Sequence, residues 1–171
     1  MFDIKPKDSF LNLIDEIKKA IELDLYNCAL ALTLTLPDIC GKVEYPNEKT
    51  KKRYINWLEN YATSFFTEPT ILLPNEENIE YTWLLKEECY ALRCAVLHSG
   101  NYDLNEVGLL KVDIHVHKKD GENYSHIVKG EHYVDWDLIK LCETLCNAAE
   151  EYYLNSSDKN KLDVAEIRID T

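Results

Sequence analysis

Apolar side chains recur at helical spacing from the start of the chain. Every third or fourth position after Ser9 is apolar, which predicts an amphipathic helix that Asp8 or Ser9 would cap. The next segment, LYNCALALTLTL, is apolar nearly all round and rich in Ala and Leu, so a central helix is favoured although its leucines also alternate as in a strand. Pro37 and Gly41 are placed to end that helix.

The same spacing predicts two helices in the middle of the chain. One has its apolar face at Tyr54, Trp57, Leu58, Tyr61 and Phe65 and stops before the proline-containing loop EPTILLPNEEN. The next runs roughly from Ile79 to His98, with Leu85, Cys89, Leu92 and Val96 inward and Gly100 at its end.

The period then changes from helical to two. Val112, Ile114 and Val116 alternate with polar residues, Asp120-Gly121 is a hairpin turn signal, and YSHIVKG is the expected return strand. Asp135 can then cap a last helix whose inward positions are Leu138, Leu141, Cys142, Leu145, Ala149 and Tyr152, and the tail LDVAEIRID can add a short strand.

These elements predict a mainly α fold. We expect an antiparallel bundle of about five helices with a β-hairpin inserted before the last helix. Residues 1–171 then form a single helical domain, and the hairpin insertion covers about 109–130.

Charge and composition narrow the classes of function. The chain has 31 acidic and 19 basic residues and a formal net charge of −12, which disfavours holding long nucleic acid but leaves room for a local positive site. No secretory signal or long apolar span is visible, so we expect a soluble cytoplasmic protein that binds no membrane. The six cysteines lie on apolar, helix-like segments with no export signal, so we expect them to be reduced and buried.

One segment, EECYALRCAVLHSGN, contains residues that can act in catalysis. Arg93 is followed after four residues by His98 near a predicted helix end, and the acidic pair Glu87 and Glu88 lies one to two turns earlier. This pattern, with the helices around it, resembles the HEPN (higher eukaryotes and prokaryotes nucleotide-binding) family, whose ribonuclease members share an Arg, four to six residues, His signature. The resemblance implies a homodimeric endoribonuclease of toxin–antitoxin or phage-defence type, with the site in a cleft between protomers.

The residue types suit RNA cleavage. RNA carries its own nucleophile, the 2′-hydroxyl, so no metal or other cofactor is expected. A histidine such as His98 can transfer protons near neutral pH, and the guanidinium of Arg93 can stabilise the charged transition state. Glu87 or Glu88 would orient one of the pair, or form a salt bridge with Arg93 in a purely structural role. Cys94 occupies a supporting position that is usually polar in active members of the family.

Helix geometry sets a condition on this site. Five steps of about 100° place Arg93 and His98 roughly 140° apart around an ideal helix. The two side chains can converge only if the last turn is loosened or a twofold partner contributes one of them.

Two other clusters are candidates. His115 and His117 share one face of their strand, and a two-residue turn would place His126 opposite His115 and near Tyr124. Contact with RNA bases is the favoured role of this patch, ahead of metal binding. A zinc site can also be drawn from Cys94, His98, Cys142 and Cys146, but core thiols are the favoured interpretation and no metal is expected.

Two functions therefore remain open. One is a homodimeric, metal-independent HEPN-like endoribonuclease that acts on RNA and is restrained by an antitoxin or other protein partner. The other is a non-catalytic HEPN-like module that binds a nucleotide, RNA or protein, or serves as a dimeric scaffold.

Overall fold

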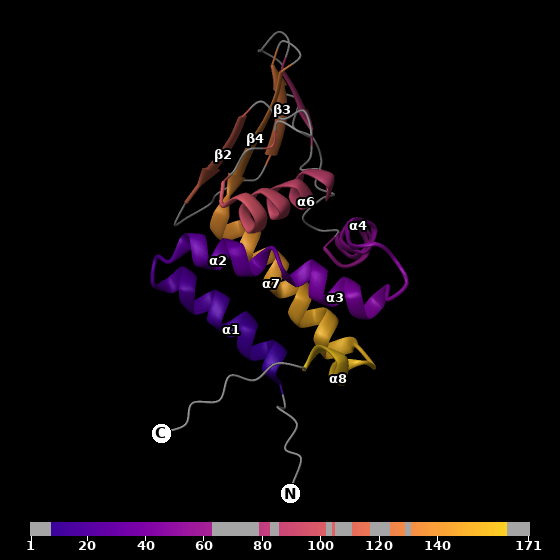
Figure 1. Cartoon of the computed structure of the whole chain (residues 1–171). Helices are drawn as coiled ribbons and strands as arrows, with labels where there is room; N and C mark the ends of the chain where they lie inside the picture. The colour runs from indigo at the N-terminus through magenta and orange to yellow at the C-terminus, as the bar shows by residue number, and fades with distance from the viewer. Residues whose placement is uncertain are drawn as a thin grey trace, which may run out of the picture.

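The structure is a computed structural model that describes residues 8–62, 79–82, 86–101, 104, 111–116, 124–128 and 131–163. Helices make up most of it, and a small sheet lies at one end, next to α6 (Figure 1). The elements are α1 (Ser9–Glu22), α2 (Tyr26–Thr33), α3 (Leu36–Glu44), α4 (Thr50–Tyr61), β1 (Ile79–Thr82), α6 (Lys86–Cys94), the π-helix η1 (Ala95–Ser99), β2 (Lys111–His115), β3 (Tyr124–Val128), β4 (Glu131–Asp137), α7 (Leu138–Asn155) and α8 (Lys159–Leu162).

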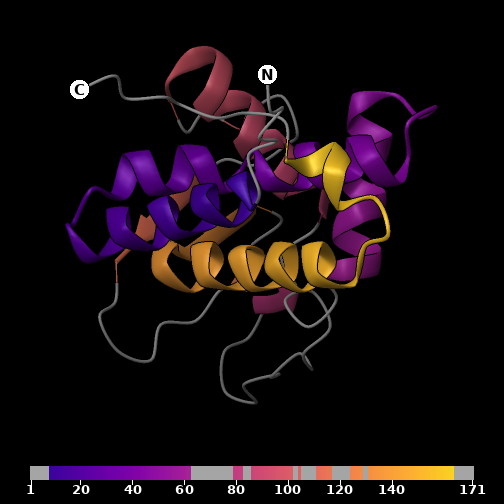
Figure 2. The ribbon, with the colours of Figure 1, turned by 90° about the horizontal axis from the view of Figure 1, so that it is seen from below.

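The long helix α7 is the centre of the bundle. It contacts α1, α2, α3, α4 and α8, and it runs alongside α1 when the molecule is seen from below (Figure 2). All six positions expected to face inward on this helix are buried, so that prediction is confirmed. Trp136, fully buried in β4 immediately before α7, extends the same core to the base of the sheet.

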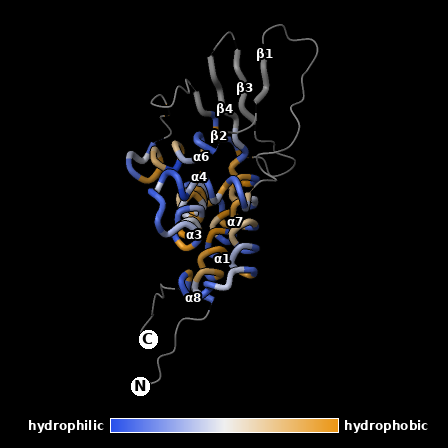
Figure 3. Tube along the Cα trace, turned by 90° about the vertical axis from the view of Figure 1, so that its right-hand side faces the viewer, coloured by the Kyte–Doolittle hydropathy of each residue, from blue (hydrophilic) through white to orange (hydrophobic). Residues whose placement is uncertain are grey.

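The amphipathic pattern of α1 is also confirmed. Phe10, Ile14 and Ile17 are buried, and Figure 3 shows apolar and polar residues mixed along α1 and α7, as expected of helices that bury one side. The predicted cap is wrong, because neither Asp8 nor Ser9 caps the helix with its side chain. Instead, Oδ1 of Asp163 accepts a hydrogen bond from the Phe10 backbone N–H at 3.1 Å.

The expected single helix after Asp24 is two helices, α2 and α3, separated at Leu34 and Thr35. Pro37 lies in the first turn of α3, where its missing N–H costs least, so it begins a helix here instead of ending one. Gly41 is buried within α3, where an added Cβ would lie only 2.8 Å from the Arg53 carbonyl oxygen of α4. The glycine therefore permits close packing of α3 on α4.

The fold class is confirmed: a mainly helical bundle with strands placed before the last long helix. The strand pairing differs from the expected hairpin, because the sheet order is β1-β3-β4-β2. β3 pairs antiparallel with β1 and β4, whereas β2 pairs with β4 in parallel, so β4 separates the two strands that Asp120-Gly121 was expected to join. Two strands of this sheet, β1 and β4, lie outside the expected 109–130 insertion.

Two further boundaries differ from the sequence expectation. Residues 79–82 form β1 instead of the start of a helix, and Asp135 lies within β4. The cap of α7 is Asp137, whose Oδ1 accepts a hydrogen bond from the Lys140 N–H at 2.7 Å. The β-branched and aromatic residues of 131–137 favour the strand over an earlier helix start. Phe65 lies outside the described residues, and so does most of the expected tail strand at 162–170, whose first residue, Leu162, ends α8.

All six cysteines are free thiols, and four of them are buried as expected. Cys40, Cys89, Cys142 and Cys146 are buried, whereas Cys94 is half-buried and Cys28 is exposed. Burial raises the pKa of Cys146 to about 11 and that of Cys142 to about 12, which keeps both thiols protonated at neutral pH. Among the described helices, none is both long and apolar enough to cross a membrane.

The close approach at Gly41 gives a stability prediction. Helix propensity alone would make Gly41→Ala stabilising by about 1 kcal/mol. We expect the clash with the α4 backbone to reverse that sign and lower the free energy of unfolding by about 1–3 kcal/mol. Urea denaturation measures the change, and Lys42→Ala at the neighbouring exposed position is the control. A more stable Gly41→Ala protein would contradict the packing described here.

Candidate functional site

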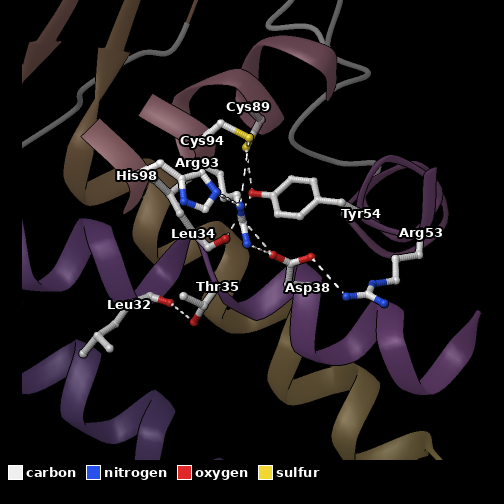
Figure 4. A network of polar contacts seen from close by, with 10 residues as sticks. All are labelled: Leu32, Leu34, Thr35, Asp38, Arg53, Tyr54, Cys89, Arg93, Cys94 and His98. Atoms are coloured by element: carbon white, nitrogen blue, oxygen red, sulfur yellow. Dashed lines mark hydrogen bonds and ion pairs between the residues drawn. The ribbon is translucent and has the colours of Figure 1, made fainter. Parts of the chain in front are cut away.

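Arg93 and His98 converge within one chain. Arg93 lies in the last turn of α6 and His98 in η1, and Nη1 of Arg93 is 3.0 Å from Nε2 of His98 (Figure 4). The ideal-helix separation is overcome because residues 95–99 form a π-helical turn, which is wider than an α-helical one. Gly100, with φ 64°, then ends the helix where expected. The loosened last turn required for convergence is therefore present.

The Arg93–His98 contact also defines the tautomer of the histidine. A guanidinium has only donor N–H groups, so Nε2 of His98 must accept the hydrogen bond. The neutral imidazole in this arrangement carries its hydrogen on Nδ1. Protonation of Nε2 would remove the acceptor and break the contact. The arrangement thus holds His98 with a lone pair directed at Arg93.

Asp38, from the first turn of α3, anchors the guanidinium. Its Oδ2 lies 2.8 Å from Nε and 2.6 Å from Nη2 of Arg93 (Figure 4). The two side chains are only 13% and 16% exposed, so the pair is largely removed from water. Arg53 of α4 lies on the other side, with Nη2 3.9 Å from Oδ1 of Asp38. One carboxylate therefore joins α3 to α6 and lies near α4.

Sequence reasoning missed Asp38. The expected partners of Arg93 were Glu87 and Glu88, which precede it on the same helix, but the ion pair is made with a residue 55 positions earlier. The available signal was an acidic residue directly after a helix-starting proline, where the helix dipole favours negative charge. That signal places Asp38 in a first helical turn but does not indicate which cation it meets.

Electrostatics keep Arg93 charged. Burial by itself would lower the pKa of the Arg93 guanidinium, but the Asp38 charge and the hydrogen bonds to Cys94 and Asp38 outweigh it and raise the pKa. Nη1 of Arg93 also lies 4.0 Å from Sγ of Cys94, the adjacent supporting residue. The site therefore presents a permanent cation next to the His98 imidazole.

A cavity of about 410 Å³ lies beside His98, between α4 and α6, and is called the α4–α6 cavity below. Lys51 comes from α4, and Glu87, Tyr90 and Cys94 come from α6. The remaining lining residues are Ala91, Ala95, His98, Ser99, Asn101 and Leu104. Glu88, by contrast, is buried beside Cys89 and is not among the lining residues. The structure thus brings Glu87, Cys94 and His98 together and sets Glu88 apart.

Aromatic packing supports the wall of this cavity. The fully buried Tyr54 donates its hydroxyl to the Leu34 carbonyl oxygen at 3.3 Å and lies 3.7 Å from Sγ of Cys89. Its ring meets the Tyr90 ring edge-on, with centroids 5.3 Å apart. Burial is the main cause that raises the pKa of the Tyr90 phenol, and a hydrogen bond with Cys94 raises it further. Tyr90 therefore stays neutral near pH 7.

The expected histidine patch is not assembled as predicted. His115 pairs with Asp137, whereas His126 pairs with Tyr133 and, on its other side, with Tyr81. The two partner positions on β4 are therefore four residues apart, about 13 Å along the strand. The assumed register was wrong because β2 and β3 are not neighbours. His117 lies outside the described residues, and for Tyr124 only the backbone is described.

The drawn zinc cluster is not assembled either. Cys94 and His98 line the α4–α6 cavity, whereas Cys142 and Cys146 are buried in α7. In the part of the chain that the structure describes, no group of three or more His, Cys, Asp or Glu side chains is arranged to hold a metal ion.

Fold and site together define a mainly helical protein with an Asp–Arg–His constellation beside a cavity. The constellation joins α3, α6 and η1, and its histidine faces the cavity. No protein-family model, curated protein or solved structure matches the chain.

The buried ion pair gives a second stability prediction. Asp38→Asn removes the charge that compensates Arg93, so we expect the free energy of unfolding to fall by about 1–3 kcal/mol. Urea denaturation is the measurement. Asp15→Asn, at an exposed position of α1, makes the same chemical change as a control and should have little effect. Equal stability of the two variants would show that the pair contributes nothing to folding.

Proposed function

We propose that the chain is a HEPN-like, metal-independent endoribonuclease with Arg93 and His98 as its catalytic residues. The observation that carries the proposal is the 3.0 Å contact between these two side chains beside a cavity that also contains Lys51. A proton-transfer group and fixed positive charge are the two components that RNA cleavage needs, because the 2′-hydroxyl is already in the substrate. The spacing that resembles the family signature supports the same reaction.

In the proposed reaction a substrate phosphate takes up the Nη1 hydrogen bond of Arg93. Nε2 of His98 is then free to accept the proton of the 2′-hydroxyl. The 2′-oxygen forms a bond to phosphorus while the bond from phosphorus to the 5′-oxygen breaks. Arg93, held by Asp38, stabilises the charge on the phosphoryl oxygens. The products are a 2′,3′-cyclic phosphate and a 5′-hydroxyl end.

The leaving 5′-oxygen needs a proton, and a second copy of the chain can supply it. We propose a homodimer in which the protonated His98 of the second protomer acts as the general acid across the shared cleft. The two-protomer cleft is what the family resemblance implies. We further propose a cytoplasmic toxin or phage-defence role with a protein antitoxin as the restraining partner, a context that rests on the resemblance alone.

A non-catalytic RNA- or nucleotide-binding module is the second candidate. The same contact favours it, because the Nε2 lone pair that would accept a proton is already used by Arg93. In such a module, the pair would position a phosphate without cleaving the strand. RNA binding without detectable cleavage would support this second function over the first.

Cleavage assays test the catalytic proposal. Purified protein should cut a labelled single-stranded RNA with EDTA present and leave cyclic phosphate ends. His98→Gln should lower the rate by about 10²–10⁴-fold because proton transfer is lost. Arg93→Lys keeps a positive charge but loses the planar fork, and should lower the rate by about 10²-fold or more.

Leu97→Gln is the matched control. It changes an exposed residue of the same π-helical turn that does not line the cavity, so its rate should stay near that of the wild type. Cleavage that persists unchanged in His98→Gln, or that disappears when EDTA is added, would refute the catalytic proposal.

A further inference from the structure

We propose that the α4–α6 cavity binds one unpaired nucleotide of an RNA strand, with the base against Tyr90 and a phosphate between Lys51 and His98. This inference rests on the proposed function, because it supplies the subsite next to the reacting phosphate. It assigns Lys51, Tyr90 and Glu87 to substrate binding, whereas Arg93 and His98 are assigned to the chemical step.

The cavity is large enough for a small ligand, and both apolar and polar side chains line it. Its volume of about 410 Å³ lies within the range of roughly 300–1,000 Å³ that such sites occupy. Alanine and leucine side chains form apolar walls, and a few polar groups are placed among them: an ammonium, a carboxylate, a phenol, an amide and a hydroxyl. A nucleotide matches this mixture, because it combines a flat ring with hydrogen-bonding edges and an anionic phosphate.

Tyr90 is suited to contact a base because its ring is supported from behind. The edge-on contact with Tyr54 restrains it, and Tyr54 is itself fully buried and hydrogen-bonded to the main chain. A restrained aromatic ring loses little conformational freedom when a base packs on it. Stacking on tyrosine is a common means of holding unpaired bases.

Lys51 is suited to contact the phosphate. Its Nζ lies over the Tyr90 ring, 6.0 Å from the ring centroid, so a base that packs on the ring displaces the ammonium towards the phosphate. The protein as a whole carries a net charge of −12, which repels a polyanion except where cations are locally concentrated. Lys51 is the cation that lines the cavity, and the Arg93 guanidinium lies next to His98 at its edge.

Glu87 accounts for the remaining charge in the cavity. A carboxylate repels phosphate but accepts hydrogen bonds from amino and ring N–H groups at a base edge. Lys51 and Glu87 therefore favour opposite ends of a nucleotide, phosphate at one and base edge at the other. This polarity selects an unpaired nucleotide, because in a duplex the same base edge is paired and the base cannot leave the stack without a cost.

The width of the cavity is supported by an ion pair between the two helices that form it. Nζ of Lys86, at the start of α6, lies 2.8 Å from Oε1 of Glu59 on α4. The buried pair of Tyr54 on α4 and Cys89 on α6 lies between the same helices. The site is thus largely formed before a ligand binds, which favours binding of a single flat group.

Binding to an uncleavable strand tests the subsite independently of catalysis. The probe is a fluorescein-labelled single-stranded RNA with 2′-O-methyl riboses throughout, which have no nucleophilic hydroxyl, and the readout is fluorescence anisotropy. We expect Tyr90→Leu to weaken binding about tenfold, because the stacking ring is lost, and Tyr90→Phe, which keeps the ring, to weaken binding much less. Lys51→Gln should lower the slope of log K against log salt by about 0.7, the value for one lost phosphate contact.

Lys52→Gln is the control for Lys51→Gln. It removes the same charge from the adjacent position of α4, but Lys52 is exposed, pairs with Glu48 and does not line the cavity. Its affinity and salt slope should therefore match those of the wild type. A duplex of the same sequence should compete poorly with the labelled strand.

The outcomes separate the two proposals. Equal effects of Lys51→Gln and Lys52→Gln, unchanged binding by Tyr90→Leu, or no binding of the strand by the wild type would overturn the subsite, even if the protein cleaves RNA. Binding that depends on Lys51 and Tyr90 would support the subsite, even if no cleavage is found and the catalytic proposal fails. Thermal unfolding of Tyr90→Leu is compared with that of Tyr90→Phe, which retains the ring. The comparison shows whether weaker binding by Tyr90→Leu comes from a folding defect.

Discussion

The candidate site depends on the positive charge of Arg93, which is largely buried and therefore needs a compensating negative charge. The Arg93 guanidinium is only 16% exposed, and Asp38 compensates it with two contacts to a single carboxylate oxygen. Removing one partner of a largely buried ion pair leaves the other charge uncompensated, and this costs more free energy than the intact pair contributes. Asp38 and Arg93 therefore constrain each other's positions. Because they lie on different helices, the constraint also sets the position of α6 against α3. The direction of Nη1 toward His98 follows from that anchoring.

The π-helical turn brings His98 to the anchored guanidinium and so completes the candidate site. In a regular α-helix, His98 would lie on a different face from Arg93, and the anchored guanidinium would have no imidazole within reach. The wider turn at 95–99 brings Nε2 to 3.0 Å from Nη1 and leaves the ring beside the α4–α6 cavity. Local irregularity of the backbone is thus what joins a structural ion pair to a group capable of proton transfer.

Sequence patterns predicted the features that are local and periodic. The inward faces of α1 and α7, the end of the helix at Gly100 and the need for a loosened turn before it follow from residue spacing. The break between α2 and α3 was missed because Pro37, which begins α3, was interpreted as the end of the helix before it. The strand pairing was wrong because a local turn signal was preferred to the non-local pairing of β2 with β4. The ion pair of Asp38 with Arg93 was not predicted for a related reason, because the two residues are 55 positions apart in the sequence.

The cap of α1 has a consequence for the order in which the molecule folds. The Phe10 amide and the Asp163 carboxylate that accepts its hydrogen bond are 153 residues apart in sequence, and Tyr153 of α7 also donates to Asp163. On the ribosome, α1 emerges first but cannot acquire this cap until α7 and the turn after it have been synthesised. Until then the first turn of α1 lacks this hydrogen bond, and the part of its apolar face that packs on α7 is exposed. A contact of such high sequence separation also raises the contact order, and a high contact order goes with slow folding.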